Sequence, residues 1–150
     1  MTVTMQQVLA ELDRDEPDYP HAAELGTEAL PHLRQIIEAN DPLRAAKAAY
    51  LASLIPNNGS TDLLRQAADR REPEVRVAVA HALRNTAQVP TDVLGGLLDD
   101  PDPGVRKVAL STVRAVGVPE LRDKVEHIAE HDSEAFVREV AAEAVRAQQG

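Results

Sequence analysis

Asp102-Pro-Gly-Val-Arg106 is the clearest copy of a short phrase that recurs along this chain of 150 residues. The other copies are Asp41-Pro-Leu-Arg44, Glu72-Pro-Glu-Val-Arg76 and a degenerate Ser133-Glu-Ala-Phe-Val-Arg138. The four arginines are 32, 30 and 32 residues apart, and an alanine-rich apolar pattern follows each of them. A period near thirty residues is typical of stacked helical units that cover one another. The phrase therefore predicts a repeat protein, not one closed globule.

The helices that follow the phrase are predicted to be amphipathic. Their apolar residues recur at i, i+3, i+4, i+7 and i+8, which forms a stripe facing a neighbouring helix. The stripe positions are Val75, Ala78, Val79, Ala82 and Leu83; Val105, Val108, Ala109, Thr112 and Val113; and Val137, Val140, Ala141, Ala144 and Val145. In the first copy Lys47 occupies a stripe position. We expect either that its ammonium group extends to solvent at the end of the stack or that this helix is rotated.

Composition narrows the classes of function. A net charge of −9 disfavours general affinity for nucleic acid and for an anionic membrane surface. The absence of cysteine excludes disulfides, thiolate zinc sites and cysteine nucleophiles. The first residues have neither the basic nor the apolar region of a secretory signal, and no apolar run approaches the roughly 20 residues that span a bilayer. We therefore expect a cytoplasmic protein that does not bind membranes.

Breaks rich in Pro, Gly, Asn and Asp divide the chain into a short N-terminal segment and a repeat domain. Residues 1–20 are predicted to contain one helix followed by a linker or cap, because two prolines oppose continuation of the helix. In the first unit Pro31 lies inside a predicted helix over 21–39 and should kink or divide it. The repeat domain covers residues 21–150, with units of about 21–56, 60–87, 90–117 and 118–149.

The third unit resembles the HEAT-repeat family, in particular its short bacterial members. The family pattern is a leucine-rich first helix, then Asp-x-Asp-Pro-x-Val-Arg, then an alanine-rich second helix. Leu97-Leu-Asp-Asp-Pro-Asp-Pro-Gly-Val-Arg-Lys-Val-Ala109 matches it almost in full, and the resemblance covers about residues 21–149. It implies an all-α fold: a right-handed α-solenoid of about four helix pairs, whose second helices line the concave surface.

The resemblance also implies a structural role for the repeated arginine, which in this family usually bonds to acidic or backbone groups of an adjacent turn. We therefore expect a ladder that ties one unit to the next. Its expected members are Arg76, Arg106 and Arg138 with Asp69, Asp99, Asp102 and Asp132.

No recognised catalytic motif is present. His127 and His131 stand at i and i+4, a spacing that can place two imidazoles on one helix face, as a metal site needs. The order Glu126-His127 differs, however, from the His-Glu-x-x-His of zinc proteases. HEAT-like hydroxylases carry His-Glu pairs, and this chain has no such dipeptide. With no glycine-rich phosphate loop and no serine nucleophile motif either, we expect no enzyme activity, no metal and no cofactor.

The best candidate for binding is a stripe of the second helices that is predicted to face away from the core. Arg84, Arg114 and Arg146 occupy one position of three successive units, so that a stack would space them about 10 Å apart. A row of guanidinium groups can bind carboxylates or phosphates. The alternative is a solvated face balanced by Glu139 and Glu143. The binding candidates on this stripe are His81, Arg84, Lys107, Arg114 and Arg146.

We predict a non-catalytic scaffold that binds another protein or an acidic peptide segment on its concave face. One alternative is a nucleic-acid-binding protein similar to HEAT-like DNA glycosylases, which the charge and the near absence of aromatic residues disfavour. Another is a metal-dependent HEAT-like hydroxylase or a phycobilin-lyase-like subunit. The apolar flank of the last helix, Val140, Ala144 and Val145, is a candidate interface for weak self-association.

Overall fold

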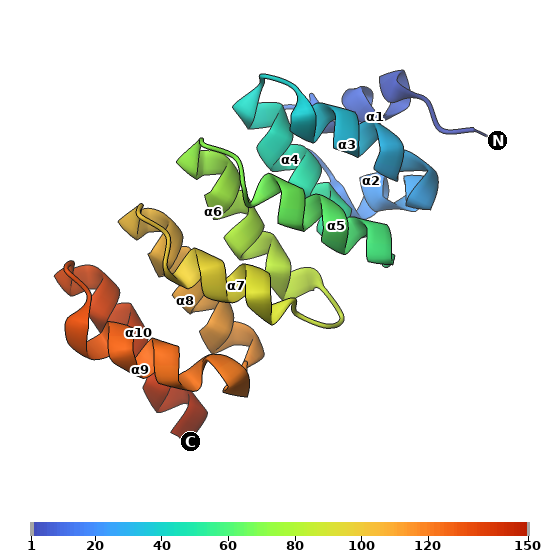
Figure 1. Cartoon of the computed structure of the whole chain (residues 1–150). Helices are drawn as coiled ribbons and strands as arrows, with labels where there is room; N and C mark the ends of the chain where they lie inside the picture. Colours follow the sequence, from blue (N-terminus) through green and yellow to red (C-terminus); the bar gives the residue numbers. More distant parts are fainter. Residues whose placement is uncertain (1, 150) are drawn as a thin grey trace.

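The computed structural model describes residues 2–149 as a stack of short helices in two layers (Figure 1). The first layer contains α3 (Leu30–Glu38), α5 (Asn58–Ala67), α7 (Thr91–Leu98) and α9 (Arg122–His131). The second layer contains α4 (Pro42–Ser53), α6 (Pro73–Ala82), α8 (Pro103–Val116) and α10 (Ala135–Gln149). Second-layer helices contact one another in chain order, α4 with α6, α6 with α8 and α8 with α10. The all-helical α-solenoid is therefore confirmed, whereas its right-handed sense stays a prediction.

The second helices begin where the repeated phrase predicts. Pro42, Pro73 and Pro103 are each the first residue of their helix, a position where the missing amide hydrogen costs nothing. The preceding aspartates cap the exposed amides. Asp41 accepts from the Arg44 amide, and Asp102 accepts from the amides of Gly104 and Val105.

The first unit is divided differently from the sequence-based expectation. Residues 19–38 form α2 (Tyr19–Ala22), a 3₁₀ segment η1 (Ala23–Ala29) and α3. The break falls at Gly26, whose φ of 76° lies in the left-handed region that glycine adopts most easily. Pro31 does not kink a helix, because it lies in the first turn of α3, where its ring is tolerated.

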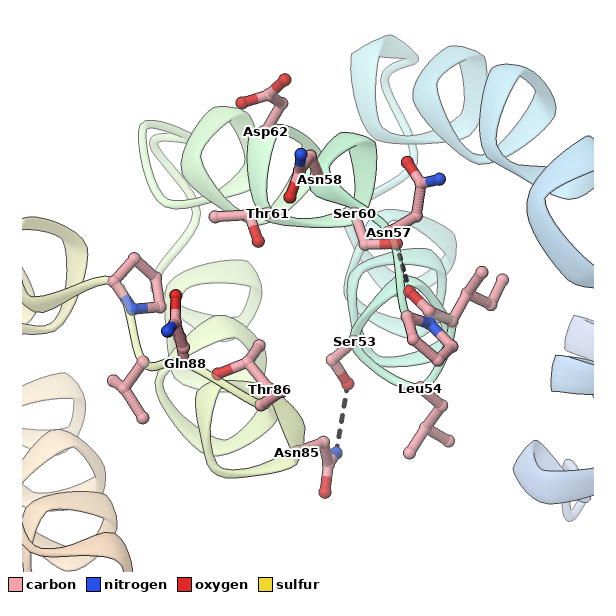
Figure 2. Close-up of a pocket in the computed structure, with 15 residues that line it drawn as sticks. Ser53, Leu54, Asn57, Asn58, Ser60, Thr61, Asp62, Asn85, Thr86 and Gln88 are labelled. Atoms are coloured by element: carbon pink, nitrogen blue, oxygen red, sulfur yellow. Dashed lines mark hydrogen bonds between the residues drawn. The ribbon is translucent and has the colours of Figure 1, made fainter.

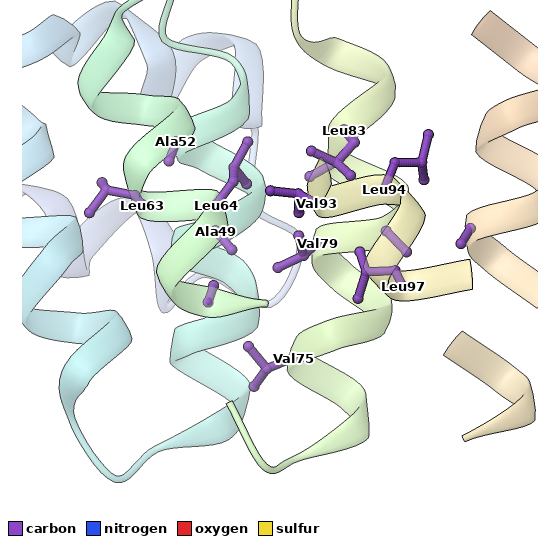
Figure 3. Packing of buried hydrophobic residues seen from close by; sticks show 14 of the residues in the cluster. Ala49, Ala52, Leu63, Leu64, Val75, Val79, Leu83, Val93, Leu94 and Leu97 are labelled. Atoms are coloured by element: carbon purple, nitrogen blue, oxygen red, sulfur yellow. The ribbon is translucent and has the colours of Figure 1, made fainter. Parts of the chain in front are cut away.

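The core is built from leucine, valine and alanine and runs through the whole stack. Figure 3 shows Leu63 and Leu64 of α5 beside Ala49 of α4 and Val75 and Val79 of α6. All five side chains are almost completely buried. Alanine predominates on the second helices, which allows these helices to approach one another closely. The repeat motif thereby gives every second helix the same depth in the stack.

The N-terminal helix α1 (Met5–Leu12) covers the start of the stack. Thr4 and Gln7 form a capping box at its beginning, and Val8 and Leu12 are fully buried. At its end the Lys47 ammonium donates to the Leu12 carbonyl over 3.0 Å. Lys47 therefore neither extends to solvent nor marks a rotated helix: its charge caps the C-terminus of α1, where the helix dipole favours a cation.

Two short 3₁₀ segments complete the chain. They are η2 (Leu83–Asn85), which continues α6, and η3 (Pro119–Leu121), which precedes α9. Within residues 2–149, no helix is long and apolar enough to cross a membrane.

Candidate functional site

The arginines of the repeated phrase bridge successive units. Arg106 donates from Nε and Nη2 to the Asp132 carboxylate of the next unit over 2.8 and 2.9 Å. Its Nη1 donates to the carbonyls of Asp100 and Pro101 at the turn of its own unit. Arg76 repeats this pattern with the Asp100 carboxylate at 2.8 and 3.1 Å. These side chains are largely shielded from solvent, with exposures of 13 and 6% for Arg76 and Asp100.

The acidic partners differ from most of those expected. Asp100 and Asp132 stand six residues before the repeated arginines Arg106 and Arg138, and this position faces the preceding unit. Asp99 instead pairs with Lys124, and Asp102 caps α8. The remaining candidate, Asp69, is exposed and makes no ion pair within the described residues. Asp132 is the one expected carboxylate that receives a repeated arginine.

The Arg106 contact changes the acidity of Asp132. Burial acts to raise the pKa of Asp132, but hydrogen bonds from the Arg106 guanidinium and the Glu134 amide outweigh it. The pKa of Asp132 is therefore lowered from its ordinary value, and the carboxylate is charged at neutral pH.

The second row of arginines also makes contacts between units. Arg84 donates from Nη2 to the Thr112 hydroxyl over 2.9 Å and from Nε to the His81 carbonyl over 3.1 Å. Arg114 donates from Nη1 to Glu143 over 3.1 Å, and both side chains are well exposed. Arg146 and Lys107 are exposed and have no hydrogen bond or ion pair to any residue in 2–149. Two of the three expected guanidinium groups are thus partly engaged inside the protein.

A run of aromatic rings crosses three successive units beside this row. Tyr19 meets Tyr50 edge to face with ring centroids 4.7 Å apart, and Tyr50 stacks on His81 at 5.7 Å. Burial, and then the neighbouring Tyr50, raises the pKa of Tyr19. Burial, and then the Arg84 cation, lowers the pKa of His81, which favours the neutral imidazole at pH 7. Both tyrosines remain partly accessible, and His81 is exposed.

Sequence analysis had singled out His81 but not the two tyrosines. A signal for them was available: Tyr19, Tyr50 and His81 are spaced by 31 residues, which is the repeat period. A residue spacing that equals the period places side chains at neighbouring heights of a stack. The tyrosines are the only two in the chain, so that their joint placement concentrates most of its aromatic surface.

A groove of about 970 Å³ opens next to the aromatic run, between the turns at 54–62 and 85–90. Figure 2 shows Asn58, Thr61 and Gln88 around it and a hydrogen bond across its floor from Asn85 Nδ2 to Ser53 Oγ, at 3.1 Å. The Asn58 and Gln88 amides make no hydrogen bond to other described residues. Arg84 immediately precedes Asn85, so that the groove continues into the face that carries the rings.

The paired histidines do not form part of a larger ligand set. The rings of His127 and His131 lie 4.6 Å apart on α9. Across residues 2–149 there is no group of three or more histidine or carboxylate side chains that could hold a metal ion.

The comparisons with known proteins agree with the architecture. A family model described as HEAT repeats matches residues 61–146, which is more than half of the chain. A search of curated proteins gives no significant match. HEAT repeats commonly mediate contacts between proteins. From the repeated phrase, the stacked helix pairs and this match together, the chain belongs to the HEAT-repeat family.

Proposed function

We propose that this protein is a non-catalytic interaction scaffold whose second-helix face binds an acidic segment of a partner protein. We define the second-helix face as Tyr19, Tyr50, His81, Arg84 and Lys107, with the adjoining groove over 85–90. The resemblance to HEAT proteins places this face on the concave side. The observation that carries the proposal is the accessible aromatic run, which a chain with only 2% aromatic residues concentrates on one face.

The chemistry of the face suits a peptide. Tyrosine rings supply large contact areas at a low cost in side-chain entropy, and tyrosine and arginine are enriched in protein interfaces. Lys107 has no carboxylate partner among the described residues, and Arg84 is paired only with neutral groups. Both cations therefore favour an acidic segment in a molecule that is otherwise negative. The free amides of Asn58 and Gln88 can bond to the backbone of an extended peptide lying in the groove.

The proposal is tested with a displayed library of 15-residue peptides rich in Asp and Glu. Selected peptides are labelled and their dissociation constants are measured by fluorescence anisotropy at low and high salt. We expect Tyr50→Ala and Lys107→Glu each to weaken binding at least tenfold, and added salt to weaken it further. Arg34→Glu is the matched control, because Arg34 is exposed on α3 in the opposite layer; it should leave binding unchanged.

The outcomes separate the proposal from its alternatives. Equal losses in Lys107→Glu and Arg34→Glu would indicate nonspecific attraction and reject the second-helix face. Failure to select any peptide would reject an acidic segment as the partner. Binding of a labelled DNA duplex at low salt that is lost in Lys107→Glu would favour the nucleic-acid alternative.

A further inference from the structure

The two arginine rows share a direction: each described contact between units runs from an arginine to the unit that follows it. Arg76 and Arg106 donate to carboxylates that lie 24 and 26 residues later. Arg84 and Arg114 donate to Thr112 and Glu143, which lie 28 and 29 residues later. Every second helix from α6 onward thus carries one arginine of each row toward its successor.

On α10 the corresponding residues are Arg138 and Arg146. Arg138 keeps only the bond inside its own unit, from Nη1 to the Asp132 carbonyl at 2.6 Å. Within residues 2–149, no carboxylate occupies its Nε and Nη2 edge, and Arg146 has no partner. The bond from Nη1 holds the Arg138 guanidinium as its counterparts are held. The edge that would bind a carboxylate is therefore already oriented.

The apolar residues between the two arginines are correspondingly less covered. Ala80 and Leu83 on α6, and Leu110 and Val113 on α8, are completely buried. Their counterparts on α10, Ala142 and Val145, are only half-buried. We call Arg138, Ala142, Val145 and Arg146 the outer face of α10. Ala144 does not belong to it: the α8 residue at the same register, Thr112, bonds back to Ala80 of the preceding unit.

A second copy of this chain is a poor occupant of the outer face. Two α10 helices that packed antiparallel about Ala142 would bring Arg138 of one copy against Arg146 of the other, and like charges repel. The opposite end of the stack is covered by α1, and its Asp13 carboxylate already binds Arg44 at 2.7 and 3.0 Å. Charge complementarity thus favours a different protein.

We propose that the outer face of α10 docks a helical hairpin of a partner protein, and the internal interfaces define its chemistry. The hairpin carries a carboxylate at the turn between its helices, which binds Arg138. Its second helix carries a hydroxyl or a carboxylate 11 or 12 residues later, which binds Arg146. These spacings are those of Asp100 to Thr112 and of Asp132 to Glu143. Small apolar side chains cover Ala142 and Val145. The proposal does not depend on the second-helix face.

The first experiment supplies a hairpin of this chemistry as the probe. A second copy of residues 88–117 is joined directly after residue 149. The added aspartate then stands 24 residues after Arg138, as Asp100 stands after Arg76. We chose this hairpin because it packs on Ala80 and Leu83, the pair most similar in size to Ala142 and Val145. Arg138→Gln and replacement of the added aspartate by asparagine are made singly and together in the extended chain.

We expect the added hairpin to fold, to resist protease and to couple with Arg138 by at least tenfold in the unfolding equilibrium constant. In the parent chain Arg138→Gln should change that constant far less. A hairpin that is cleaved at the rate of an unfolded segment, or a coupling near one, overturns the proposal.

The second experiment searches for the natural partner with the full chain. A photo-crosslinking amino acid replaces Val145, and crosslinked segments from an extract of the native cells are mapped by mass spectrometry. We expect a helical hairpin with the stated carboxylate spacing, and at least a tenfold loss of capture in Arg138→Glu but not in Arg34→Glu. Capture of only a second copy of the chain, of segments without that spacing, or of nothing overturns the proposal.

Discussion

The first interface of the stack and the later interfaces use the same repeat position with opposite charge. Six residues before the repeated arginine stand Asp100 and Asp132 in the last two units, and both accept an arginine from the preceding unit. In the second unit the same position is Arg70. It cannot accept, so the Arg44 guanidinium turns back to Asp13, beyond the end of α1.

Arg70 takes over the task that the later arginines perform inside their own units. It donates to the carbonyls of Ile37 and Ala39 at the end of α3, and to Glu72. The comparison teaches that the repeat conserves the filling of two acceptors, a carboxylate and a helix end, whereas which arginine fills them depends on a single charge. Four changes test this, from the largest expected effect to the smallest.

Arg106→Ala should destabilise the protein by about 3 kcal/mol, because it leaves the shielded Asp132 carboxylate without its cation. Arg44→Ala should cost below about 1 kcal/mol, because the Arg44–Asp13 pair is exposed. Urea unfolding measures both. Equal losses would show that the later interfaces do not depend on the buried pair.

Acid should narrow the Arg106→Ala difference. The pKa of Asp132 is lowered in the folded state, so its contribution is complete above the unfolded value of about 3.9 and disappears as pH falls through the folded value. A difference that stayed constant down to pH 2 would contradict this assignment.

Arg70→Ala should cost about 2 kcal/mol, since charge-assisted bonds to the carbonyls at the end of α3 are lost. Hydrogen exchange should rise in α3 more than in α7. Arg71→Ala is the matched control, because this neighbouring arginine is exposed and its side chain has no described bond. An equal loss in the control would remove the proposed role of Arg70.

Lys47→Ala should loosen α1 at a cost of about 1 kcal/mol, because the Leu12 carbonyl loses its donor and the helix end loses its cation. Limited proteolysis within residues 1–18 should speed up while the later units stay protected. Unchanged cleavage would indicate that Val8 and Leu12 alone hold α1 in place.

His81→Gln should produce the smallest effect, visible only in the pH dependence of stability. The pKa of His81 is lowered by burial and by Arg84, so below about pH 6.5 the unfolded chain binds a proton more readily than the folded one. Wild-type stability should therefore fall as pH drops from 7 to 5, and less so in His81→Gln. Parallel thermal melting curves in this range would disprove the effect.

The sequence by itself determined the repeat, the helices and their starting points. Asp-Pro fixes where α4 and α8 begin, and the spacing of Val75, Val79 and Leu83 fixes which face enters the core, because these preferences act within one or two helical turns. The break at Gly26 instead of Pro31 was missed because both residues disrupt helices, and only packing decides which of them lies inside one.

Only the tertiary structure decided which neighbour each charged group selects. Arg76 could have reached Asp69 or Asp99 by sequence distance, yet it binds Asp100 across the interface between units. The 31-residue spacing of Tyr19, Tyr50 and His81 becomes a surface only when successive units stack at a fixed height. A side chain's partner depends on the crossing and separation of helices some thirty residues apart, which no local pattern encodes.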